Sequence, residues 1–100
     1  MSQTDEQLLQ QESRGQRARD VIESDVYRDA FDQVKTEIIE QWQNAPARDQ
    51  EGRERLWVML KLLEKVDSCL SQTMDSGTIA RQELAYRKTL PERAKEWLRR

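Results

Sequence analysis

The chain contains no histidine and only one cysteine, Cys69. Histidine is the commonest general base and the commonest metal ligand, so its absence argues against both kinds of site. A single cysteine cannot form an internal disulfide or supply the ligands of a zinc site, and no glycine-rich phosphate loop occurs. We therefore predict that the protein is not an enzyme and uses no metal and no cofactor.

Long apolar runs are also missing. The longest run, LWVML, occupies only positions 56–60, whereas a membrane-spanning helix needs about 20 apolar residues. The first ten residues, MSQTDEQLLQ, lack the basic and apolar regions of a signal peptide. We expect no membrane association and a cytoplasmic location.

Glycine and proline are scarce, with three and two residues, and hydrophobic and charged residues each make up 36% of the chain. This composition favours long solvated helices over a sheet and predicts a single all-α domain. The net charge of −2 hides an asymmetry, because residues 1–76 carry a net charge of −6 and residues 77–100 one of +4. The sequence thus combines an acidic body with a basic tail.

Two helices are predicted from apolar residues spaced three and four apart, at about 25–44 and 50–75. Ser24 and Asp49 are suitable N-caps, Pro46 ends the first helix, and Gly77 lies where a glycine would end the second. The loop between the helices is short, which predicts an antiparallel helical hairpin over residues 20–76, with Trp42 near positions 52–53. A coiled-coil seam is predicted for the second helix at Leu56, Met59, Leu63, Val66 and Leu70.

The flanking segments are polar. Residues 1–19 are predicted to be flexible or a short helix, because Gly15 weakens helical structure there. Residues 77–100 form the basic segment, in which Thr89 and Pro91 are expected to start a separate terminal helix at about 90–99.

The second helix carries more apolar residues than the seam requires. Trp57, Val58, Leu60 and Leu62 lie off it, so Leu56–Leu63 is apolar nearly all round, and such a helix is normally buried on all sides. Two helices cannot provide that cover, which must come from a third element of the chain, a second copy or another protein. We predict that Trp57, Val58 and Leu62 contribute to a partner-binding surface.

The basic tail has two interpretations. Its cations can simply complement the dipole of a solvated terminal helix, or the tail can dock on a partner as an amphipathic helix. In the second case the partner-binding residues are Arg93, Lys95, Trp97, Leu98 and Arg99. The same cations could bind nucleic-acid phosphates, although the acidic body would repel a duplex.

The stretch DVYRDAFDQVKTEIIEQWQNAPARDQEGRERLWVMLKLLEKVDSCLSQTMDSGTIAR resembles small helical proteins encoded among the virion-structure genes of tailed bacteriophages. The similarity covers about residues 20–81 and includes the short loop with proline, GRERLW at the start of the second helix, and the Gly77-x-x-Ala80 motif.

The resemblance implies a virion assembly or accessory role in the host cytoplasm or the virion, with capsid, portal or tail proteins as partners. A homo-oligomer is possible. An inhibitor of a host protein and a nucleic-acid-binding accessory factor stand as the alternative functions.

Overall fold

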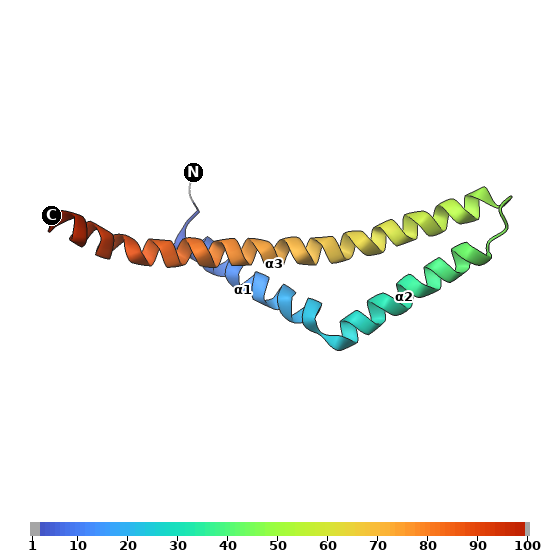
Figure 1. The fold of residues 1–100 in the computed structure, drawn as a ribbon, viewed down its shortest axis with the longest axis horizontal. Helices are drawn as coiled ribbons and strands as arrows, with labels where there is room; N and C mark the ends of the chain where they lie inside the picture. Colours follow the sequence, from blue (N-terminus) through green and yellow to red (C-terminus); the bar gives the residue numbers. More distant parts are fainter. Residues whose placement is uncertain (1–2, 100) are drawn as a thin grey trace. The chain divides into compact units, whose positions relative to one another are not determined.

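Residues 3–99, which the computed structural model describes, form three α-helices and no strand (Figure 1). They are α1 (Asp5–Glu23), α2 (Asp25–Asn44) and α3 (Gln50–Leu98). The prediction of an all-α fold is confirmed. The chain divides into two compact units: a first unit made of the residues up to Arg19 together with those from Gln72 onward, and a second unit made of Asp20–Ser71.

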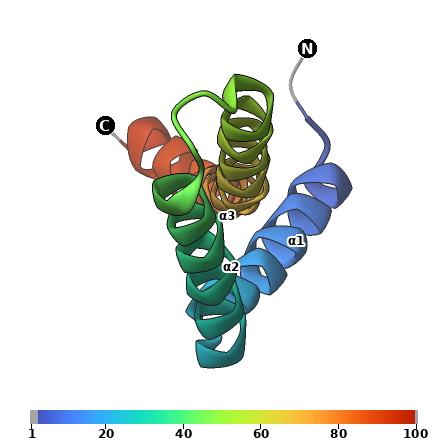
Figure 2. The same cartoon turned by 90° about the vertical axis from the view of Figure 1, so that its right-hand side faces the viewer.

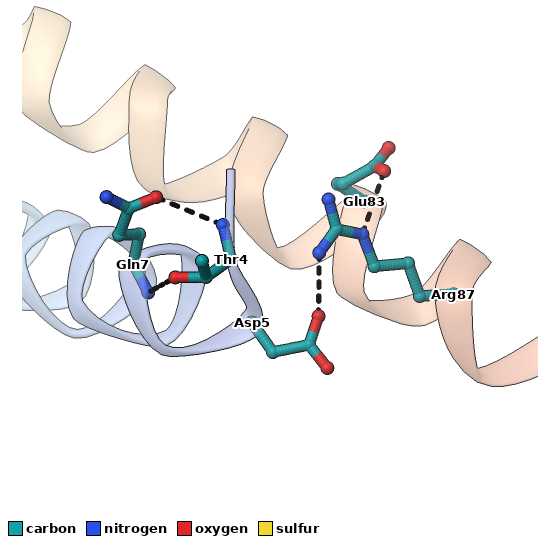
Figure 3. Close-up of polar contacts among 5 residues, drawn as sticks. All are labelled: Thr4, Asp5, Gln7, Glu83 and Arg87. Atoms are coloured by element: carbon teal, nitrogen blue, oxygen red, sulfur yellow. Dashed lines mark hydrogen bonds and ion pairs between the residues drawn. The ribbon is translucent and has the colours of Figure 1, made fainter. Parts of the chain in front are cut away.

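α1 begins at a capping box that the sequence analysis missed. The backbone N–H of Gln7 donates to the Thr4 hydroxyl (3.2 Å), and the backbone N–H of Thr4 donates to the Gln7 side-chain oxygen (3.0 Å) (Figure 3). These two bonds satisfy amides that a helix start leaves without partners. The segment predicted to be flexible or a short helix is therefore part of a regular helix of 19 residues.

In the first unit, α1 crosses the later half of α3 at two glycines (Figure 1). A Cβ atom built on Gly15 would lie 2.6 Å from the Gly77 Cα, and one built on Gly77 would lie 2.6 Å from the Gly15 Cα. Ala18 and Ala80, each three residues further along its helix, are buried beside them. Only residues without larger side chains permit this contact between two backbones.

An ion-pair cluster joins the same two helices near the start of α1. The Arg87 guanidinium donates to Asp5 (2.7 Å) and to Glu83 (3.1 Å), as Figure 3 shows. Both hydrogen bonds raise the pKa of Arg87. The two carboxylates are exposed, whereas Arg87 is half-buried, and ion pairs with exposed partners add little to stability.

α3 does not end where the sequence analysis placed its end. The predicted stop near Ser76 is wrong, because Gly77 lies inside the helix as part of the crossing with α1. The predicted separate helix at 90–99 is also absent, since α3 continues through Pro91 to Leu98. Proline removes one backbone donor, and in the preceding turn the Thr89 hydroxyl donates to the Tyr86 carbonyl (2.7 Å).

In the second unit, α2 has the bounds predicted for it, and α3 begins at the predicted residue. The Ser24 hydroxyl accepts the backbone N–H of Tyr27 (3.3 Å), and the Asp49 carboxylate accepts that of Gly52 (3.1 Å). Both predicted N-caps are confirmed. Figure 2 shows the short loop that joins the end of α2 to the start of α3.

α2 and α3 run antiparallel, and contacts between them are seen near both ends of α2. Arg53 near the start of α3 bonds to the Trp42 carbonyl near the end of α2, and Asp67 lies beside Tyr27 at the other end. The predicted seam is partly wrong. Met59 and Val66 are 50% and 55% exposed, whereas Leu56, Leu60, Leu63, Asp67 and Leu70 are the less exposed row.

The Tyr27 hydroxyl oxygen is the one buried side-chain polar atom in the described part of the chain that forms no hydrogen bond of good geometry, although the Asp67 carboxylate lies within its reach. Burial raises the pKa of Tyr27 above 10.0, and the Asp67 carboxylate raises it further. The phenol is thus held in its neutral form beside a negative charge.

The glycine crossing yields a first prediction. Gly15→Ala or Gly77→Ala should lower the free energy of unfolding by about 1–3 kcal/mol, because the new methyl group overlaps the facing backbone. In an isolated helix the same substitution would raise stability. A loss of stability therefore indicates that the two helices are in close contact at the glycines. Urea unfolding measures it, with Ser76→Ala, an exposed change one position away, as the control. A stabilised Gly77→Ala variant would contradict the crossing.

Tyr27 yields a second prediction. Tyr27→Phe should leave the free energy of unfolding at neutral pH within about 1 kcal/mol of the wild-type value, because removing the buried hydroxyl also removes its contact with Asp67. The phenol pKa is higher in the folded chain than in the unfolded one. The stability that the neutral Tyr27 phenol contributes is therefore complete below pH 10.0. It is lost as the pH rises through the pKa of Tyr27 in the folded chain.

Urea unfolding between pH 7 and 11 measures both effects. The wild type should lose more stability than Tyr27→Phe at the alkaline end, and the exposed Tyr86→Phe is the control. If Tyr27→Phe lost as much stability as the wild type between pH 7 and 11, the phenol would not be buried beside Asp67.

Candidate partner-binding groove

An apolar groove of about 290 Å³ lies in the second unit, between the end of α2 and the start of α3. It is lined by six apolar residues: Ile38, Ile39, Trp42, Leu56, Trp57 and Leu60. Ile38 is buried at its base. The two indoles remain 44% (Trp42) and 56% (Trp57) exposed. The groove therefore offers aromatic surface to an apolar group from outside the chain.

Arg53 fixes the side of the groove that Trp42 forms. Its guanidinium Nη1 donates to the carbonyl oxygens of Trp42 and Ala45, both at 3.2 Å. These carbonyls lie at the C-terminal end of α2, where few intrahelical donors remain, and the Trp42 carbonyl also accepts the backbone N–H of Ala45 (3.3 Å). The Arg53 Cζ also lies 4.3 Å from the centroid of the Trp42 ring. A single cation thus caps α2 and holds the Trp42 indole in place.

A second cation lies at Trp57. The Lys61 Nζ is 5.5 Å from the centroid of the Trp57 ring and 3.5 Å from a Glu64 carboxylate oxygen. Lys61 and Glu64 are both exposed, so their ion pair contributes little to stability. The groove consequently has an apolar interior with Arg53 and Lys61 beside its two indoles.

The residues that the sequence analysis proposed for this surface do not share one face. Trp57 lines the groove, whereas Val58 and Leu62 do not. At 3.6 residues per turn, Trp57 and Leu62 point about 140° apart around α3. Leu62 is 62% exposed on the flank that carries Met59 and Val66.

The proposed residues of the basic tail lie at the end of α3 in the first unit. The Arg93 Cζ is 5.4 Å from the centroid of the Tyr86 ring, and the Lys95 carbonyl accepts the backbone N–H of Arg99. Trp97 and Leu98 are about three-quarters exposed. These two side chains are accessible, and neither lines the apolar groove.

Most of the groove was not predicted, because Leu56 was assigned to the coiled-coil seam and no residue of α2 was assigned to a binding surface. A usable signal was present. Trp42 lies in the last turn of α2 and Trp57 about two turns into α3, so an antiparallel register brings both indoles to the loop end of the helix pair. Large aromatic residues beside an exposed loop are typical of a binding surface.

A larger hollow, of about 440 Å³, lies in the first unit beside the glycine crossing. Its lining mixes Leu9 and Met74 with Glu12 and three arginines, Arg17, Arg19 and Arg81. Flexible charged side chains form its walls, and holding them around a ligand costs side-chain entropy. We therefore regard the apolar groove, whose walls are branched and aromatic side chains, as the candidate site.

Within residues 3–99, no three His, Cys, Asp or Glu side chains lie in an arrangement that could hold a metal ion. None of the described helices has an apolar stretch long enough to cross a membrane. No protein family, curated protein or solved structure matches this chain.

Arg53 yields the third prediction. Arg53→Ala should lower the free energy of unfolding by about 1–2 kcal/mol, because the Ala45 carbonyl loses its donor, the Trp42 carbonyl keeps only the Ala45 backbone N–H, and the Trp42 ring loses its cation. Arg53→Lys should recover only part of this, because an ammonium cannot present two guanidinium donors in a fork. Urea unfolding with Arg48→Ala, an exposed loop change, as the control measures the effect. An Arg53→Ala variant as stable as the control would show that these contacts do not hold the groove.

Proposed function

We propose that this chain is a non-enzymatic interaction protein that takes part in virion assembly of a tailed phage. Its helical hairpin, residues 25–44 and 50–75, serves as the rigid body, and the apolar groove receives a protein partner. The observation that carries the proposal is the pair of exposed indoles, Trp42 and Trp57, on a groove lined only by apolar residues. Tryptophan is enriched among the residues that dominate binding energy in protein interfaces.

The charges near the groove favour a particular kind of ligand. Arg53 and Lys61 lie against the two indoles, so an apolar side chain in the groove would have cations on both sides. An amphipathic segment with acidic residues beside its apolar anchor would fit these charges.

The virion context rests on the resemblance of residues 20–81 to helical proteins of tailed-phage structural gene clusters. It implies capsid, portal or tail proteins as partners, in the host cytoplasm or the virion. In this proposal the exposed Trp97 and Leu98, with Arg93, Lys95 and Arg99, form a second docking segment that adds affinity when both sites are engaged.

The fourth prediction tests the groove. Tagged wild-type protein should retain a phage capsid, portal or tail protein from a lysate of infected cells, identified by mass spectrometry. Trp57→Ala should weaken this binding about thirtyfold, as truncating an interface hot spot does. The matched control is Leu9→Ala, which removes an apolar side chain that is also 56% exposed but lies outside the groove.

Helix content measured by circular dichroism should be equal in all three proteins. Equal retention by wild type and Trp57→Ala would exclude the groove as the binding site. Specific, groove-dependent retention of a host enzyme in place of virion proteins would reject the assembly role in favour of inhibition of a host protein.

A further inference from the structure

The second unit has another exposed apolar surface, on the flank of α3 that faces away from Trp57. Met59, Leu62 and Val66 are 50–62% exposed and follow one another at intervals of three and four residues. This is the spacing of a coiled-coil seam. The α3 residues that turn toward α2 are a different row, centred on Leu60 and Leu63, so contact with α2 does not use this one.

α2 adds apolar residues to the same side. Val26 and Val34 lie on one flank of the helix and are 74% and 42% exposed. Because α2 and α3 run in opposite directions, with Arg53 at Trp42 and Asp67 at Tyr27, helical geometry turns this flank to the side that bears Leu62. Five residues thus form what we call the second apolar face: Val26, Val34, Met59, Leu62 and Val66.

Two opposite charges border the second apolar face near the loop. Glu37 lies on its α2 edge and Arg55 on its α3 edge, within about one helical turn of the same level. Within the described residues Glu37 is bonded only to the Gln33 side chain (3.3 Å), and no ion pair engages Arg55. The face therefore presents an acidic edge and a basic edge at one end of an apolar centre.

We propose that a second copy of this chain covers the second apolar face. A two-fold axis parallel to the helices would place α2 of each copy on α3 of the other. Glu37 of one copy would then meet Arg55 of the other, twice per dimer, and Val34 would pack near Leu62 of the second copy. The face is self-complementary in this arrangement, as an isologous interface requires. The result is a four-helix arrangement whose apolar rows are buried.

This interface is separate from the apolar groove. Trp57 and Leu62 point to different sides of α3, so the dimer leaves both grooves open. The proposal does not depend on what the groove binds, and the two can fail independently.

The fifth prediction concerns the oligomeric state, measured by sedimentation over a concentration range with the full chain. The wild type should sediment with twice the monomer mass of 11.9 kDa. Leu62→Lys should weaken dimerisation by about a hundredfold or more, because it buries an unpaired charge. Leu62 is exposed in the single chain, so the helix content of the variant monomer should be unchanged. Ile79→Lys, which changes a side chain of similar exposure (65%) in the first unit, should dimerise as the wild type does.

A charge exchange tests the orientation of the two copies. Glu37→Arg and Arg55→Glu should each weaken dimerisation about tenfold, because each places like charges together across the interface. The double variant should recover most of the wild-type affinity.

A monomeric wild type at all concentrations would overturn the proposal, as would a Leu62→Lys variant that dimerises normally or an Ile79→Lys variant that does not. Single charge variants with unchanged dimerisation would overturn the two-fold arrangement.

Discussion

The contact between Gly15 and Gly77 is the constraint on which the first unit depends. A methyl group on either residue would lie 2.6 Å from the facing Cα, so the approach of α1 to α3 has no room for any other residue type. Gly15-x-x-Ala18 and Gly77-x-x-Ala80 face each other, and Ala18 and Ala80 are buried beside the glycines. Two helices this close need few large apolar side chains between them, which suits a chain with only 36% hydrophobic residues.

The same contact explains why glycine does not end either helix. Glycine in a helix interior costs about 1 kcal/mol relative to alanine. When α1 and α3 are considered separately, this cost predicts a break at Gly15 and the end of a helix after Ser76. The packing of the two helices outweighs this propensity, because both glycines are used for close approach. A property of a pair of helices cannot be read from either helix alone.

The sequence predicted local features well and the orientation of helix faces poorly. Ser24, Asp49 and Pro46 act through neighbouring backbone groups, so the bounds of α2 and the start of α3 were predictable. The row of α3 residues that faces α2 could not be predicted in the same way. Met59 and Leu60 are both apolar, and the inward position 67 holds an aspartate that pattern analysis places outside. The candidate groove was only partly predicted for the same reason: Trp57 was assigned to a binding surface, but Leu56 was assigned to the seam and no α2 residue was included.

The distribution of apolar residues on α3 then has a physical explanation. Leu56–Leu63 is apolar nearly all round because three directions around one helix need apolar surface. Leu56, Leu60 and Leu63 turn toward α2, Trp57 turns toward the groove, and Met59 and Leu62 turn toward the second apolar face. Stability of the helix pair by itself requires only the first row. The other two rows leave about half of each large side chain in water, an arrangement that a solvated two-helix unit does not need and that contact with other chains would relieve.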